Sequence, residues 1–138
     1  MPTTDPELAG GCLCNAVRYR LTAEPFDAGW CHCRMCQLNS GSPAMVFASV
    51  LSGDYLVETG EQHIRRYASS EKAERWFCGR CGSPLLFREY DGTTHDFSVA
   101  TLDRPEAVLP GFHIYFDSRI AWAEPADDLP RFPRSRHG

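Results

Sequence analysis

The sequence of 138 residues lacks the features that mark membrane, secreted and nucleic-acid-binding proteins. No apolar run approaches the roughly 20 residues that a helix needs to cross a bilayer. The segment Met1 to Glu7 has neither a basic start nor an apolar stretch, so nothing there resembles a secretory signal. With a formal charge of −4 and a pI near 5.7, the chain has no basic surplus for binding phosphate backbones. These absences predict a cytoplasmic protein without a membrane partner and disfavour a nucleic-acid partner.

The sequence also lacks internal repeats and long helical patterns. Ten prolines and eleven glycines predict many turns between short elements. Helical turns are expected only at 34–38 and 105–108. The length fits a single domain over residues 1–138. Its ends, 1–7 and the proline- and charge-rich 127–138, are expected to be loosely packed.

Short apolar segments predict strands. From Val17 to Thr22 apolar and polar residues alternate, as in a half-buried strand. The segment 44–51 is apolar at nearly every position, which predicts a central strand buried on both faces. Two further segments, 55–58 and 63–67, flank a short polar stretch containing Gly60 and are expected to pair as a hairpin. The predicted fold class is mainly β, with small antiparallel sheets.

Seven cysteines dominate the chemistry of the sequence. They form a CxC pair, a CxCxxC triple and a CxxC pair, at Cys12, Cys14, Cys31, Cys33, Cys36, Cys78 and Cys81. A reducing compartment and an odd number of cysteines argue against a disulfide framework. Metal binding is therefore the favoured interpretation, and a redox-active or disulfide-bonded triple is the alternative.

The two pairs have the composition of a closed, structural zinc site. In extended backbone Cys12 and Cys14 point to the same face, and the CxxC turn of Cys78 and Cys81 directs both sulfurs at one ion. Four thiolates from two distant segments would clamp a long loop, so that metal affinity contributes to folding. Spacing alone also allows the triple to share an ion with either pair.

The triple at Cys31, Cys33 and Cys36 then supplies three ligands and leaves a fourth position open, as in catalytic zinc sites. Three thiolates give the site a formal charge of −1, which makes the ion a weak activator of water. Binding an exogenous thiol as a thiolate fits this site better, because zinc lowers the pKa of a thiol.

Histidines offer an alternative in which this site is closed. His32 lies between two of the thiols and is expected to face away from the metal, because neighbouring residues in extended chain face opposite ways. Either His113 or His95 would turn the triple into an inert structural site. The spacing matches neither common ferredoxin pattern, which disfavours an iron–sulfur cluster.

Polar residues near the triple have two interpretations. Arg34 and Gln37 flank the predicted open position and would hold an anionic substrate, or they are ordinary surface residues of a loop. Other basic residues show no informative spacing and are expected to form a solvated face: Arg65, Arg66, Lys72, Arg75 and Arg80.

Four sequence blocks spread over nearly the whole chain form a specific pattern. They are Gly11-Cys12-Leu13-Cys14 followed by Val17-Arg18-Tyr19, Cys31-His32-Cys33-Arg34-Met35-Cys36 with Ser40-Gly41-Ser42-Pro43, Phe77-Cys78-Gly79-Arg80-Cys81-Gly82-Ser83-Pro84-Leu85, and His113-Ile114-Tyr115 with Ser118 and Trp122. This pattern resembles the family of glutathione-dependent formaldehyde-activating enzymes, which includes centromere protein V. Asn15 departs from it, since the family usually has glycine there, but asparagine tolerates left-handed backbone.

The resemblance implies a zinc-stabilised β-tent fold with two zinc ions. It implies structural zinc at the four paired cysteines, catalytic zinc at Cys31, Cys33 and Cys36, and glutathione as the co-substrate. The implied activity is that of a carbon–sulfur lyase, in which the thiolate of glutathione, or an adduct such as S-hydroxymethylglutathione, occupies the open position. The competing hypothesis is a non-catalytic zinc-binding module that recognises a protein or nucleic acid.

Overall fold

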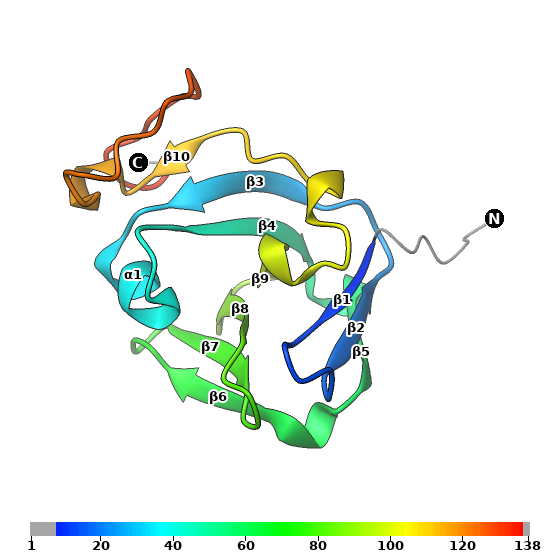
Figure 1. The fold of residues 1–138 in the computed structure, drawn as a ribbon. Coiled ribbons are helices and arrows are strands. Elements are labelled where there is room, and N and C mark those ends of the chain that lie inside the picture. The colour runs from blue at the N-terminus through cyan, green and yellow to red at the C-terminus, as the bar shows by residue number, and fades with distance from the viewer. Residues whose placement is uncertain (1–7, 137–138) are drawn as a thin grey trace.

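A computed structural model describes residues 8–136 and arranges their strands in two sheets (Figure 1). The larger sheet has the strand order β10-β3-β4-β9-β8-β7-β6, and the smaller has the order β1-β2-β5. In Figure 1 the larger sheet curves from β3 round to β6, and the smaller sheet stands at its right. The strands are β1 (Ala9–Gly11), β2 (Arg18–Leu21), β3 (Phe26–Cys31), β4 (Met45–Leu51), β5 (Tyr55–Thr59), β6 (Ile64–Ala68), β7 (Ala73–Cys78), β8 (Pro84–Glu89), β9 (Thr94–Ser98) and β10 (His113–Ile114).

Short helical elements connect these strands. The α-helix is α1 (Arg34–Ser40), and 3₁₀ turns lie at Ser52–Asp54, Glu61–His63, Val99–Thr101, Pro105–Ala107 and Phe116–Ser118. Both predicted helical turns are therefore present, and the mainly β class is confirmed. Within residues 8–136, no helix has the length and apolar character needed to span a membrane.

The central strand β4 is buried on one face and only partly buried on the other, where Met45 is the buried residue. Ala48 and Val50 are fully buried, whereas Phe47 and Ser49 on the opposite face are half-buried. The prediction of burial on both faces is thus wrong for the second face. Because Phe47 and Ser49 line a cavity, their apolar and small side chains are covered only in part.

The predicted hairpin between 55–58 and 63–67 does not form. Strand β5 pairs with β2 in the smaller sheet, and β6 pairs with β7 in the larger one. Gly60 lies at the crossing with φ 82°, and a Cβ there would come within 2.0 Å of the carbonyl oxygen of Ala16. A side chain at this position would therefore clash with the backbone of Ala16.

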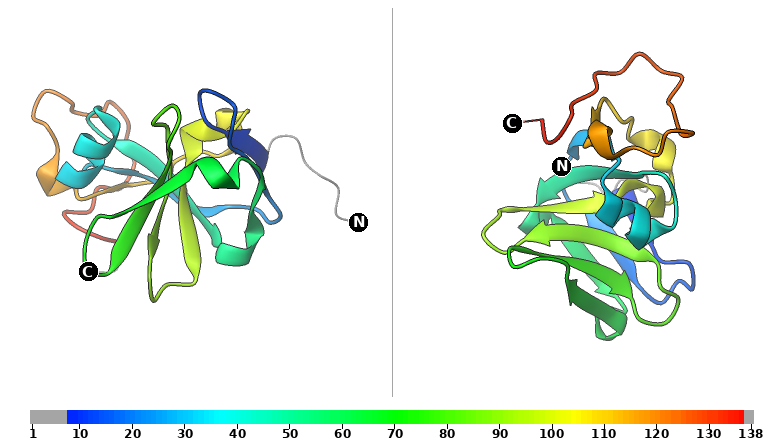
Figure 2. Two further views of the ribbon diagram at one scale, coloured as in Figure 1. Left: turned by 90° about the horizontal axis from the view of Figure 1, so that it is seen from below. Right: turned by 90° about the vertical axis from the view of Figure 1, so that its left-hand side faces the viewer.

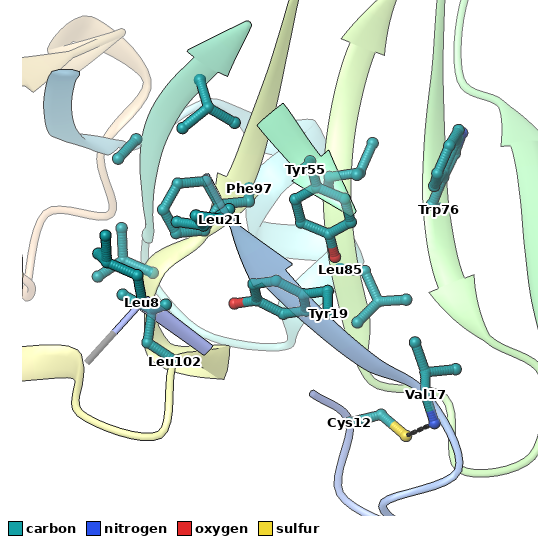
Figure 3. Close-up of a cluster of buried hydrophobic side chains, with 14 of the residues drawn as sticks. Leu8, Cys12, Val17, Tyr19, Leu21, Tyr55, Trp76, Leu85, Phe97 and Leu102 are labelled. Atoms are coloured by element: carbon teal, nitrogen blue, oxygen red, sulfur yellow. Dashed lines mark hydrogen bonds between the residues drawn. The ribbon is translucent and has the colours of Figure 1, made fainter. Parts of the chain in front are cut away.

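The main hydrophobic core lies between the two sheets. Tyr19 of β2 stacks on Tyr55 of β5 with ring centroids 4.5 Å apart, and Phe97 of β9 packs beside them (Figure 3). At the edge of this cluster the sulfur of Cys12 accepts a hydrogen bond from the backbone N–H of Val17 at 3.3 Å (Figure 3). The first cysteine pair is therefore built directly onto the core.

The C-terminal segment 127–136 is held in place, contrary to the expectation of loose packing. His113 donates its backbone N–H to the carbonyl of Pro130 and accepts from Phe132, each at 2.8 Å, and Tyr115 donates to Arg134 at 2.9 Å. Proline has no N–H to donate, but the carbonyls of this segment satisfy the free edge of β10. In the left view of Figure 2 the segment, dark orange to red, lies at the same end of the molecule as α1 in cyan. The other residues expected to be loose, 1–7 and 137–138, lie outside the described residues.

Candidate metal centres

The four paired cysteines come together at one edge of the core. Cys12 and Cys14 lie in the turn between β1 and β2, Cys78 ends β7, and Cys81 follows in the next turn. The sulfurs of Cys12 and Cys14 are 3.6 Å apart, those of Cys14 and Cys78 are 3.8 Å apart, and all four lie within 4.8 Å of one another. A tetrahedral ion with bonds of about 2.3 Å places its sulfurs roughly 3.8 Å apart. The donor set and its spacing fit zinc.

The first pair lies in a tight turn rather than in extended backbone, so that premise of the prediction is wrong. Asn15 adopts the left-handed region with φ 68° and donates its backbone N–H to the carbonyl of Cys12 at 3.0 Å. The second turn is similar, since Gly82 has φ 82° and donates to Cys78 at 2.8 Å. Asparagine and glycine are the residues that adopt this conformation most readily.

Ser83 links the two turns and was missed by the sequence reasoning. Its hydroxyl accepts the backbone N–H of Leu13 at 3.0 Å and lies 3.3 Å from the sulfur of Cys81. Donation from this hydroxyl lowers the pKa of the Cys81 thiol to about 5. The backbone N–H of Arg80 adds a bond to the sulfur of Cys78 at 3.3 Å. Such donors stabilise thiolates and so favour the metal-binding form.

The three remaining cysteines form a separate group around the start of α1. Cys31 ends β3, Cys33 is the N-cap of α1, and Cys36 lies in its first turn. Their sulfurs lie within 4.8 Å of one another, and the sulfur of Cys33 accepts the backbone N–H of Cys36 at 3.3 Å. Donation from the Cys31 and Cys36 thiols lowers the pKa of Cys33, so this cap is the first of the three to ionise. Three clustered thiols likewise suit zinc or another thiophilic ion.

No histidine in the described chain offers a nitrogen within 4.8 Å of all three sulfurs. His32 faces away from them, as expected, and its Nε2 lies 2.8 Å from Nδ1 of His113. His113 in turn bonds the Asp127 carboxylate through Nε2, at 3.0 and 3.1 Å. His95 is elsewhere, with Nδ1 3.2 Å from the hydroxyl of Ser52. A site closed by His113 or His95 is therefore not the arrangement in this structure.

The triple borders a cavity of about 620 Å³ on the face of the larger sheet that is turned away from the core. Its lining combines apolar side chains with charged ones of both signs. The residues are Asp27, Gly29, Cys31, Cys33, Arg34, Met35, Cys36, Phe47, Ser49, Arg75, Phe87, Glu89, Asp96, Phe112, Ile114, Tyr115, Ser135 and Arg136. All three cysteines of the triple thus line a space large enough for a small molecule.

Gln37 does not flank an open position, which corrects one of the two predicted anion contacts. Its side-chain amide is buried and donates to the carbonyls of His32 at 2.9 Å and Ser118 at 3.1 Å. The amide oxygen accepts from Arg34 at 3.1 Å. Gln37 therefore ties α1 to the C-terminal part of the chain, while Arg34 lines the cavity.

Arg75 is the main contact of the three-cysteine group that the sequence reasoning missed. It was expected on a solvated face, but it is only 8% exposed. Its Nη1 donates to Asn39 Oδ1 at 3.1 Å and its Nη2 to the sulfur of Cys36 at 3.6 Å. The contact joins β7 to α1 across 39 positions of sequence, so no local spacing could have indicated it.

Comparisons with known proteins identify the family of this chain. The family profile described as glutathione-dependent formaldehyde-activating enzyme matches residues 7–118. An uncharacterized lyase of Schizosaccharomyces pombe is 34% identical over 97 residues, which cover 70% of this chain and 69% of the relative. A Halomonas elongata protein, provisionally named as a glutathione-dependent formaldehyde-activating enzyme, is 31% identical over 130 residues, covering 85% of this chain and 80% of the relative.

The fold is also found in a solved structure. A crystal structure of a Rhodobacter sphaeroides protein has a TM-score of 0.60 and 23% identity, and the match covers 89% of this chain and 98% of that one. At this identity the likeness shows the fold alone. The family itself is shown by the sequence match, which spans both cysteine groups. The chain belongs to the glutathione-dependent formaldehyde-activating enzyme family.

Proposed function

We propose that the protein is a zinc-dependent carbon–sulfur lyase that binds glutathione, or a glutathione adduct, through sulfur at the three-cysteine site. The observation that carries this proposal is the convergence of Cys31, Cys33 and Cys36 at the wall of a 620 Å³ cavity, where no histidine among residues 8–136 lies close enough to complete the set. Membership of the family and the lyase name of one relative support the same class of reaction. Cys31, Cys33 and Cys36 would hold the catalytic zinc.

The second zinc would be structural and held by Cys12, Cys14, Cys78 and Cys81. These sulfurs are grouped tightly enough to surround one ion, and the turns that carry them are joined by Ser83. A four-thiolate site has no position left for a substrate. Its role is to hold the β1–β2 turn against the end of β7.

The proposed reaction needs a bound thiolate and a carbon electrophile. Zinc would supply a lowered thiol pKa, so that the substrate sulfur binds deprotonated near neutral pH. In the lyase direction the hydroxyl of S-hydroxymethylglutathione loses its proton and forms the carbonyl of formaldehyde. The electrons of the broken C–S bond pass to sulfur. The reverse reaction adds the thiolate to the carbonyl carbon, and the oxygen gains a proton.

The side chains of the cavity would orient the substrate around this bond. Phe47 and Phe87 provide apolar wall that limits the access of water to the sulfur. Arg34 lines the same cavity and carries a charge suited to a carboxylate of glutathione.

Metal stoichiometry combined with thiol titration tests the proposal. The purified protein should hold two zinc ions, and glutathione should give a saturable response at one of them. Cys33→Ser should abolish that response and the lyase activity while the four-cysteine site keeps its ion. A folded Cys33→Ser variant with full lyase activity would refute the proposal. Two zinc ions without any thiol response would instead indicate the non-catalytic binding module.

A further inference from the structure

Arg75 is a buried cation without a carboxylate partner in the described part of the chain. Its polar contacts are the side-chain oxygen of Asn39 and the sulfur of Cys36, and its guanidinium lies 5.2 Å from the ring centroid of Phe87. The Nε atom is buried and has no hydrogen-bond partner within residues 8–136. Burying a cation without compensating negative charge is costly. The three clustered cysteines are the adjacent source of such charge, once they are thiolates.

From this contact we infer that Arg75 makes the three-cysteine site prefer an anionic fourth ligand over a neutral one. The inference rests on the proposed function and deepens it, because it names Arg75 as the residue that makes the site select a substrate thiolate. Three thiolates and one divalent ion carry a formal charge of −1, and an added thiolate makes the total −2. A buried guanidinium at the sulfur of Cys36 offsets part of this charge where solvent screening is weak.

Other cations of the cavity are less suited to this role. Arg136 is engaged with Asp27 at 2.8 Å, and its side chain is 34% exposed. Arg34 is exposed and donates to Gln37. Solvent screens both of them more than it screens Arg75, whose guanidinium is fixed by Asn39 against α1. Among the three arginines that line the cavity, Arg75 is therefore the one in direct contact with a sulfur of the three-cysteine site.

Ligand preference at the three-cysteine site provides the test. The protein is loaded with Co²⁺ and titrated with thiocyanate as an anion and with imidazole as a neutral ligand. The change in Co²⁺ absorption on titration reports the three-cysteine site, because a four-thiolate site has no position for an added ligand. The quantity measured is the ratio of the two affinities. Arg75→Met should lower the preference for thiocyanate about tenfold, which corresponds to about 1.4 kcal/mol. Arg75→Lys keeps the charge and should stay within about threefold of the wild type.

Two further variants control for folding and for general charge. Arg66→Met removes a positive charge from the neighbouring strand β6, where Arg66 covers the ring of Trp76 at 4.1 Å, and should leave the ratio unchanged. Asn39→Ala changes an exposed residue and releases the guanidinium without removing its charge, so the ratio should fall about threefold. Metal content at the four-cysteine site and a thermal melt establish that each variant is folded.

The outcomes separate this inference from the proposed function. An unchanged ratio in Arg75→Met overturns the inference, and if that variant does not fold, an unchanged ratio in Asn39→Ala overturns it. An equal fall in Arg66→Met also overturns it, because the effect would then be one of net charge. If the thiocyanate ratio follows the prediction but glutathione does not bind the wild type, the role of Arg75 stands and the proposed function fails.

Discussion

The two cysteine groups differ in how far apart in the sequence their members lie and in what surrounds them. The four-cysteine group joins a turn at 12–14 to a turn at 78–81, and its sulfurs are bonded mainly to the backbone and to Ser83. The three-cysteine group comes from the single segment 31–36, faces a cavity, and contacts a buried arginine. One group is thus built like a clamp, and the other like a binding site.

This difference predicts separate energetic roles for the two ions. Closing a loop of more than sixty residues restricts the unfolded chain, so an ion held by the first group would contribute strongly to folding. The second group spans only six residues, and its helix α1 is already anchored by Gln37 and by Gly41 at its C-cap. An ion there would add little to the free energy of unfolding, so its role would be to bind substrate rather than to stabilise the fold.

The largest effect is expected from a matched pair of cysteine substitutions. Cys14→Ser should lower the free energy of unfolding by at least about 3 kcal/mol, because the structural ion is lost. Cys33→Ser should lower it by less than about 1 kcal/mol. Both side chains are at least partly exposed, so neither change opens a large cavity in the core. Urea denaturation of both variants, with metal content measured in parallel, checks the comparison. Equal losses of stability would show that the two groups are not specialised.

Two glycines allow the same contrast to be tested without touching a cysteine. Gly60 has φ 82° and lies against Ala16, just after the first cysteine turn, whereas Gly41 has φ 70° and no atom within 4 Å of an added Cβ. Gly60→Ala should cost about 2 to 3 kcal/mol and weaken metal retention at the four-cysteine site. Gly41→Ala should cost about 1 kcal/mol. Thermal melts with and without a chelator measure both effects, and a larger cost at Gly41 would contradict the proposed clamp.

A smaller effect is expected from Ser83, whose hydroxyl joins the two turns. Ser83→Ala should raise the pKa of Cys81 toward its ordinary value, because the donor that lowers it is removed. The loss of stability should be about 1 kcal/mol, and a chelator should extract the structural ion faster. Ser40→Ala is the control, since its hydroxyl bonds the carbonyl of Cys36 at 2.7 Å in the other group. If the chelator extracts the structural ion faster from both variants, Ser83 has no specific role in retaining it.

Local patterns predicted what depends on neighbouring residues. The alternation of 17–22 predicted β2, and the spacing of the thiols predicted the two groups that the structure brings together. The pairing of β5 with β2 instead joins segments that are remote in the sequence, which no local pattern records. The contact between Arg75 and Cys36 likewise joins two segments that are remote in the sequence. Contacts between remote segments decide these features, and one sequence by itself does not reveal them.

The C-terminal segment was the other feature that local composition could not predict. Prolines and charges are typical of loose tails, but here the carbonyls of 130–134 complete the edge of β10. The same segment supplies Asp127, whose carboxylate accepts a hydrogen bond from His113. His113 in turn bonds His32, which lies between Cys31 and Cys33 in the sequence. The three-cysteine group is therefore supported from outside its own segment, by residues that the four-cysteine group does not contact.

The smallest effect is expected when this support is weakened. Desolvation raises the pKa of the Asp127 carboxyl, but hydrogen bonds from His113 and Leu129 outweigh it and leave the pKa lowered. A carboxyl with a lowered folded pKa stabilises the fold above its unfolded pKa, near 4, and this contribution is lost as the pH falls through the folded value. The protection of the Phe132 and Tyr115 amides, measured as the exchange rate relative to that of an unstructured amide at the same pH, should therefore fall below about pH 4.

In Asp127→Asn, exchange at the same amides should already be faster at neutral pH, while exchange in β2 stays unchanged. Asp128→Asn, at the neighbouring exposed position, serves as the control and should behave like the wild type. If Asp127→Asn and the control exchange equally, backbone hydrogen bonds alone hold the segment. The three-cysteine group would then owe nothing to the His32–His113–Asp127 chain, and its difference from the four-cysteine group would reduce to the cavity and Arg75.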